Sequence, residues 1–284
     1  MAVTGTGTQA DPYIVSTWDE IAEYVAMDSV YVKCSPNLIF NMNTMFRTGA
    51  PSLNLHCTEF DGNGLEIRSG YWNSVPAIVS SYSGNSGDKK IKNMKILSSY
   101  TTTNIIQISA SNAWTLTLDN VIITGFHTGL DPIFRCNQYS TTAVLRMLGC
   151  SINVNSPDGS LWTSHYSDQH PFIQNTYIKF NGNNFCKASG YSPNLNSCRV
   201  DGRITQANDS SSSYIFNAST NSIINASGND LRISGSNAGA VHVLYNSDLL
   251  TPGSSIGSMQ GLTTAQLKNP QDVAATGFPV YVEE

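Results

Sequence analysis

Residues 115–123 read Thr-Leu-Thr-Leu-Asp-Asn-Val-Ile-Ile. From Thr115 to Leu118 polar and apolar side chains alternate, which is the period of a half-buried β-strand. Asn120 then precedes a second aliphatic run, and asparagine is a residue that favours turns. The stretch therefore predicts short strands separated by single turn residues, and helical periodicity is nearly absent around it.

The same signature recurs along the chain: an asparagine or a small residue, followed by residues that end in a β-branched or aliphatic one. Successive copies begin 27, 29, 26, 22 and 24 residues apart. Short repeats with several strands, and with turns that tolerate left-handed backbone, are typical of a solenoid. The pattern predicts an all-β fold, a right-handed parallel β-helix, with an antiparallel sandwich as the alternative. The copies begin at Asn93, Asn120, Gly149, Asn175, Ser197 and Asn221.

The composition agrees with stacked coils. Charged residues make up 12% of the 284, whereas Ser, Thr and Asn number 36, 24 and 28. Coils of a β-helix place equivalent positions about 4.8 Å apart, so a repeated charge would repel itself while neutral polar side chains can hydrogen-bond along the stack. A low charge content is therefore expected of this fold.

Both ends of a solenoid need a cover, and the sequence contains two capping boxes. Thr17 and Glu20 begin a short amphipathic helix whose apolar side chains include Trp18 and Ile21. Thr263 and Gln266 repeat the device near the other end. We therefore expect short capping helices at both ends of a single domain, with an N-terminal cap at 1–30, coils at 31–255 and a C-terminal cap at 256–284.

Charge and cysteine spacing exclude several classes of protein. The net charge is −5 and no Lys/Arg cluster is present, which argues against a nucleic-acid partner. No basic n-region or long apolar run marks an export signal or a membrane span. The spacing of the six cysteines matches no metal knuckle, and we expect them to be reduced core residues. They are Cys34, Cys57, Cys136, Cys150, Cys186 and Cys198.

The two ends also carry a family resemblance. Residues 5–21, which contain Gly-Thr-Gly-Thr-Gln-Ala-Asp-Pro-Tyr, resemble the opening of many bacterial and prophage β-helix proteins. Residues 261–268 with Gly277-Phe278 are similar to the closing segment of GLUG-type surface repeats, although Pro279-Val280-Tyr281 departs from the usual aromatic end. The resemblance covers about 40 of the 284 residues, concerns architecture and carries no catalytic residue.

This context favours a non-enzymatic structural protein of a bacteriophage virion, because phages assemble inside the cell and need no export signal. The expected role is an exposed decoration or adhesion module: a capsid decoration protein, a head fibre or a tail spike. Its partners would be other virion proteins and host-surface glycans, and it could assemble as a homotrimer. No membrane and no cofactor is expected. A bacterial surface adhesin is one alternative.

The second alternative is a polysaccharide-degrading tail spike, a glycosidase or a lyase. Glycoside hydrolysis needs two carboxylates facing one groove. Asp61, Asp158 and Asp201 each lie at or beside a glycine and are interpreted as turn residues. The signatures of β-helical hydrolases and lyases are absent from the sequence, so no catalytic residue is predicted.

Aromatic residues with polar neighbours are the candidates for glycan contact. Trp162 and Tyr166 lie in a predicted loop, and Tyr71 and Trp72 are similar; their flat rings suit the apolar faces of sugars. Trp114 begins an alternating strand and is interpreted as a core residue. His165, Asp168 and His170 lack a fixed metal-binding spacing, so no metal site is predicted. His56, His127 and His242 lie beside apolar neighbours and are interpreted as structural.

Overall fold

The fold was determined from a computed structural model. It describes residues 3–45, 52–69, 78–82, 87–101, 104–110, 115–129, 132–138, 144–164, 171–186, 193–204, 216–228, 233–235, 243–249, 255–256 and 259–278.

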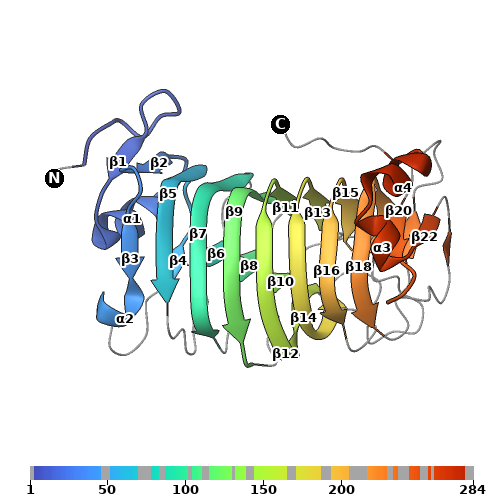
Figure 1. Ribbon diagram of the computed structural model, residues 1–284. Coiled ribbons are helices and arrows are strands. Elements are labelled where there is room, and N and C mark those ends of the chain that lie inside the picture. Colours follow the sequence, from blue (N-terminus) through green and yellow to red (C-terminus); the bar gives the residue numbers. More distant parts are fainter. Residues whose placement is uncertain are drawn as a thin grey trace.

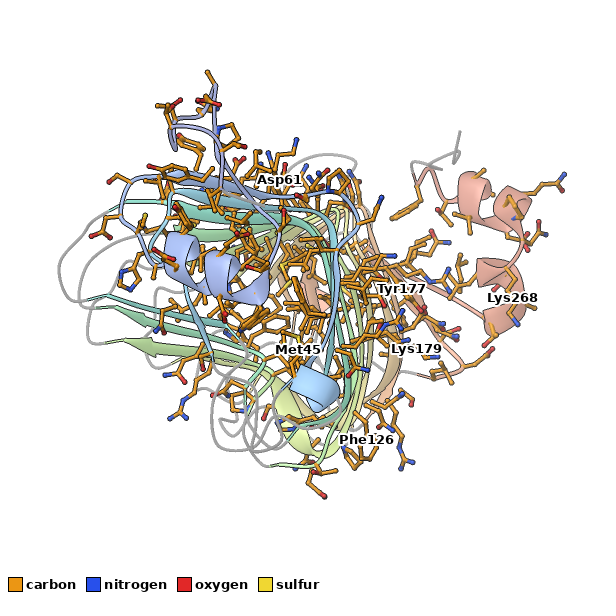
Figure 2. The ribbon with its side chains drawn as sticks, turned by 90° about the vertical axis from the view of Figure 1, so that its left-hand side faces the viewer. Met45, Asp61, Phe126, Tyr177, Lys179 and Lys268 are labelled. Atoms are coloured by element: carbon orange, nitrogen blue, oxygen red, sulfur yellow. The ribbon has the colours of Figure 1, made fainter. Side chains whose placement is uncertain are left out.

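The chain forms a right-handed parallel β-helix, as the sequence predicts. The front strands in Figure 1 run downwards while the coil advances from the N-terminal to the C-terminal side, and this sense of rotation is right-handed. All pairs between named strands are parallel, and an isolated antiparallel bridge joins Thr4 to Ile14. The strands stack in three sheets that enclose a common core (Figure 2).

We name the sheets in the order in which the chain visits them. Several long strands bend at a corner and contribute to two sheets. Sheet 1 contains β1 (Tyr13–Val15), β2 (Tyr31–Cys34), the first parts of β5 (Glu59–Ser69), β7 (Lys89–Thr101) and β9 (Thr115–His127), then β11 (Val144–Leu148), β13 (Phe172–Gln174), β15 (Asn194–Asn196), β17 (Phe216–Thr220), β19 (Ile233–Gly235) and β21 (Ser255–Ile256).

Sheet 2 faces the viewer in Figure 1, and sheet 3 lies behind it. Sheet 2 contains β3 (Ile39–Asn41), the second parts of β5, β7 and β9, the first parts of β12 (Ser151–Ser164) and β14 (Tyr177–Cys186), then β16 (Arg199–Ile204), β18 (Ser222–Gly228), β20 (Val243–Asn246) and β22 (Met259–Leu262). Sheet 3 contains β4 (Leu53–Asn54), β6 (Ile78–Tyr82), β8 (Ile106–Ala110), β10 (Phe134–Gln138) and the ends of β12 and β14.

The recurring signature of the sequence forms the corner between sheets 1 and 2. Its first residue adopts left-handed backbone in every copy, with φ between 47° and 59°. Asparagine tolerates this conformation better than most residues because its short side chain can hydrogen-bond locally. The structure adds two earlier corners that the sequence pattern missed. The corner residues are Asn37, Asn63, Asn93, Asn120, Gly149, Asn175, Ser197 and Asn221.

Equivalent positions stack in register, which builds the core as rows of apolar side chains. In sheet 2 one row consists almost entirely of isoleucine, whose β-branched shape suits a strand. All its members are at most 1% exposed, and burying each contributes about 1.5–3 kcal/mol to folding. The row is Ile67, Ile96, Ile123, Ile152, Ile178, Val200 and Ile224.

The N-terminal end is covered by α1 (Trp18–Val25), as predicted. The capping box is complete: the Thr17 hydroxyl accepts from the Glu20 amide at 3.3 Å, and the Glu20 carboxylate accepts from the Thr17 amide at 3.0 Å. Trp18, Ile21 and Val25 are buried, and the Val25 carbonyl accepts from two amides that precede β5. In Figure 2 the helix lies across the near end of the coil.

The C-terminal helices form where the second capping box predicts them, but they pack on the side of the coil. They are α3 (Thr264–Leu267) and α4 (Pro270–Ala275), and both views place them outside sheet 2 (Figures 1 and 2). Leu244 and Leu262 point outwards from β20 and β22 and form a small cluster with Val273 and Phe278. Because these leucines face outwards, the helices cover the outer surface of sheet 2.

The remaining helix, α2 (Met42–Met45), is one short turn after β3, and Met42 is buried.

Asn120 tests the role of the left-handed corner. Its φ is 53° and its amide donates to the Asn93 side chain at 2.9 Å. Asn120→Val should lower the free energy of unfolding by about 1–2 kcal/mol, because valine is strained in this conformation. Asn120→Gly loses the hydrogen bond but keeps the backbone conformation, so its loss should be smaller. Urea unfolding followed by circular dichroism measures both, and equal midpoints for the two variants would contradict the corner assignment.

Candidate functional site

A hollow of about 600 Å³ opens on the outer side of sheet 2, near the corner with sheet 1. Its floor is the outward row Tyr177, Arg199 and Ile223, and Phe278 after α4 also lines it. The corner residues of three successive coils form one edge. They are Asn175, Ser197 and Asn221. We call this hollow the corner groove.

The repeat explains why these side chains meet. Side chains alternate along a strand, so in these three coils the residue after the corner points inwards and the next points outwards. Thr176, Cys198 and Ser222 are accordingly buried, whereas Tyr177 and Arg199 are exposed. Parallel pairing then stacks the outward residues on neighbouring strands. Figure 2 shows Tyr177 on the outer side of sheet 2, facing the side where α3 and α4 lie.

A carboxylate on β16 holds the aromatic and cationic side chains of the groove. The Arg199 Nε donates to both oxygens of Asp201, at 3.2 and 3.0 Å. Partial burial, and then a hydrogen bond to the Asp201 carboxylate, raise the pKa of Tyr177 above its ordinary value. In this hydrogen bond the Tyr177 hydroxyl is the donor. Tyr177 as a whole is 37% exposed, so the side chain is held in place while part of the residue faces solvent.

Asp201 also ends a chain of amide hydrogen bonds along the outer surface. Asn225 donates to the Asp201 carboxylate at 2.8 Å, and Asn246 donates to the Asn225 oxygen at 2.6 Å. Asn246 further donates to the Thr264 hydroxyl of α3 at 3.0 Å. The groove is thus connected, coil by coil, to the C-terminal helices.

A second, smaller hollow occupies the same position of the repeat nearer the N-terminus. Its volume is about 150 Å³, and the corners Asn93 and Asn120 line it together with the outward residues Lys95 and Ile122. The groove is therefore a consequence of the corner geometry, and only its side chains differ from coil to coil. Near the N-terminus it lacks the aromatic ring.

Charged side chains on the outer surface of sheet 1 form a separate cluster. Lys92 contacts Glu59 at 2.6 Å and Asp61 at 3.6 Å, and Lys90 contacts Asp119 at 2.6 Å. Each close contact joins opposite charges on neighbouring strands. This arrangement stabilises the stack of coils and leaves the carboxylates occupied by lysine.

One of the predicted glycan contacts, Trp162, is wrong. Trp162 is 4% exposed and its ring centroid lies 6.2 Å from that of Phe134, so the indole belongs to the core. The segment around it continues β12 as a strand, in which Trp162 pairs with the buried Phe134 of β10. Tyr166, Tyr71 and Trp72 lie outside the described residues. Tyr177 was missed, although its place two residues after the Asn175 corner marks it as outward.

The aspartates interpreted as turn residues have different roles. Asp61 fits the interpretation, since its carboxylate accepts from the Asn63 amide at 2.9 Å at a corner. For Asp201 the interpretation is wrong, because β16 pairs without interruption and the side chain joins the groove cluster. Asp158 lies within β12, exposed, where the pairing with β14 shifts register.

The prediction that the lone histidines are structural is confirmed for His127. His127 is fully buried, with its Nδ1 3.1 Å from the Ser156 hydroxyl, so it is structural. The His56 Nδ1 lies 3.8 Å from the Asp28 carboxylate. Trp114 and Asp168 lie outside the described residues. The same is true of the remaining histidines, His165, His170 and His242.

The described residues contain neither a metal-binding cluster nor a membrane-spanning helix. Within the ranges given above, no three His, Cys, Asp or Glu side chains gather closely enough to hold a metal ion. In the same part of the chain, no helix has the length and apolar character needed to cross a membrane.

Comparison with known proteins adds no functional assignment. No protein-family model matches the chain, and no curated protein is significantly similar to it. The site is therefore interpreted from its own geometry.

Four cysteines are free and buried, as predicted: Cys34, Cys57, Cys150 and Cys198. Burial raises the pKa of Cys34 and Cys57 to about 12, and that of Cys150 and Cys198 to about 11. The inner stack places Thr176 between two of them, and its hydroxyl accepts from the Cys150 amide at 3.2 Å. The four cysteines are therefore packing residues of the core.

These thiols should be unreactive in the folded protein, because the thiolate is the reactive form and burial disfavours it. In a Cys136→Ser/Cys186→Ser background, we expect no reaction with Ellman's reagent at pH 8 until guanidinium is added, when four thiols should react. Rapid labelling of the native protein would show that one of the four cysteines is accessible and reactive.

Proposed function

We propose that this chain is a non-enzymatic adhesion module that binds glycans in the corner groove. The observation that carries the proposal is Tyr177, an exposed aromatic ring held at the floor of a 600 Å³ hollow. An aromatic ring buries the apolar face of a sugar, and polar groups around it bind the hydroxyls.

The surroundings of the ring supply these polar groups. Asn175 and Asn221 lie at the edge of the groove, and each amide both donates and accepts. Arg199 adds a cationic donor at the floor. Sugars carry hydroxyl groups on the rim of an apolar ring, and this combination of aromatic, amide and guanidinium groups matches them.

The scaffold favours binding because it is rigid. Tyr177 and Arg199 project from paired strands, and Asp201 fixes both side chains through hydrogen bonds. A site that is already ordered loses less conformational entropy on binding. Weak sugar contacts can then add up over several coils.

The wider role we propose is that of an exposed component of a bacteriophage particle, attached to other virion proteins. The fold is consistent with a tail spike or an adhesin-type module. The phage part rests on the resemblance of residues 5–21 and 261–268 to prophage and surface β-helix proteins. The same proposal includes assembly as a homotrimer and a location in the virion, on either the capsid or the tail.

Polysaccharide cleavage is not favoured by the charged clusters of the described residues. Glu59 and Asp61 are brought together on sheet 1, but both contact the same Lys92 ammonium group. A glycosidase needs one carboxyl group that holds a proton and a second carboxylate facing the same substrate. None of the described residues that line the corner groove is a carboxylate, and the neighbouring Asp201 is bonded to Arg199.

Tyr177→Ala should weaken glycan binding about fivefold, because the loss of an aromatic contact is worth about 1 kcal/mol. Tyr177→Phe keeps the ring and loses the hydrogen bond to Asp201, so its binding should fall less. A glycan array with the wild-type protein identifies a ligand, and isothermal titration calorimetry then compares the variants.

Phe126→Ala is the matched control, because Phe126 is also 37% exposed on the outer side of sheet 2 but does not line the groove. Its affinity should equal that of the wild type. If Tyr177→Ala bound the glycan with the same affinity as the wild type, the corner groove would not be the glycan-binding site.

The virion part is tested on particles. Phage particles purified on a density gradient from the source of the protein should contain this chain, detected by mass spectrometry. Cryo-electron microscopy of these particles would then distinguish a capsid from a tail position. Presence of the chain on the cell surface and its absence from particles would support the bacterial adhesin instead.

A further inference from the structure

The outer surface of sheet 2, in the corner groove and beside it, carries an excess of positive charge. We call the outward side chains of 151–156, 177–182, 199–204 and 222–228 the amide face. Its charged members are Lys179, Arg199, Arg203 and Asp201, and all three cations are exposed. The chain as a whole carries a net charge of −5, so this face opposes the overall charge.

The one carboxylate of the amide face is already engaged. Asp201 accepts from Arg199, from Asn225 and from the Tyr177 hydroxyl. Within the part of the chain that the structure describes, neither Lys179 nor Arg203 makes an ion pair with a carboxylate. Two cations of this face therefore remain available to an anionic ligand.

The cations lie among uncharged hydrogen-bonding groups. Asn153 and Asn155 on β12 are exposed, and Asn181 accepts from the Arg203 amide at 3.1 Å. Such amides bind hydroxyl groups, whereas nucleic-acid surfaces depend on many cations that neutralise successive phosphates. Three cations among amides suit a ligand with many hydroxyl groups and fewer negative charges.

We propose that the ligand of the groove is an acidic polysaccharide, whose anionic groups bind Lys179 and Arg203. This inference rests on the proposed glycan-binding function and specifies its ligand class. Arg199 and Arg203 are four residues apart on β16, which places them about 13 Å apart along the strand. That span exceeds one sugar ring, so the bound ligand is an oligomer that crosses from the groove over the amide face.

The test compares three soluble polymers by biolayer interferometry: polygalacturonate, dextran sulfate and neutral dextran. The first two are acidic and should bind, and their order shows whether carboxylate or sulfate is preferred. Binding should weaken as salt is raised, because exposed ion pairs are screened. Lys179→Gln/Arg203→Gln should weaken binding of the acidic polymer about fivefold.

The matched control is Lys33→Gln/Arg146→Gln, which also removes one lysine and one arginine, but from the outer surface of sheet 1. Its affinity should equal that of the wild type. Equal weakening in both double variants would overturn the inference, because binding would then depend on overall charge alone. Equal affinity for double-stranded DNA would overturn it in the same way.

The outcomes separate this inference from the function on which it rests. Binding of neutral glycans that depends on Tyr177, with no effect of Lys179→Gln/Arg203→Gln, would overturn the acidic ligand and retain the glycan site. Failure of the wild type to bind any glycan on an array or any of the three polymers would overturn both.

Discussion

In-register stacking of coils is the constraint on which the rest of the structure depends. Each residue of a strand has its equivalent about 4.8 Å away in the next coil, so every position must tolerate a copy of itself. Inside the coil this selects rows of aliphatic side chains, such as the isoleucine row that begins at Ile67. Outside, it selects amides and hydroxyls, which can donate and accept at once. The chain from Asn246 through Asn225 to Asp201 shows how such residues bond from coil to coil.

The left-handed corner links this constraint to the candidate site. A residue with positive φ turns the chain from sheet 1 to sheet 2, and at Asn63 the following Gly64 is left-handed as well. From the Asn93 corner to the Asn221 corner, the alternation that follows is the same in every coil. The inward position after the corner holds small or apolar groups such as Cys198, and the next position points to solvent. The backbone conformation of the corner thus produces a groove beside it. At one place along the solenoid, Tyr177 and Arg199 supply this groove with side chains that can bind a ligand.

Much of the fold followed from the sequence because the signature is local. Asn120 and its equivalents mark the corners by their own conformational preference, and the box around Thr17 specifies α1 without reference to distant residues. The site was harder to predict, since its members lie more than 20 residues apart and meet only through the register of β14, β16 and β18. Trp162 was misplaced because polar neighbours suggested a loop where the chain continues as a strand. The outward direction of Leu244, which holds the C-terminal helices, also depends on register alone.

The charges on the outer surface of sheet 1 restrict how such a solenoid can change in length during evolution. Lys33, Asp61, Lys92 and Asp119 occupy one row and alternate in sign from coil to coil. Deleting the single coil that carries Asp61 would place Lys33 beside Lys92, and like charges on adjacent strands are unfavourable. Removing two coils together would restore the alternation. In this part of the chain, evolution should therefore favour insertion or deletion of an even number of coils, because only an even number keeps opposite charges on neighbouring strands.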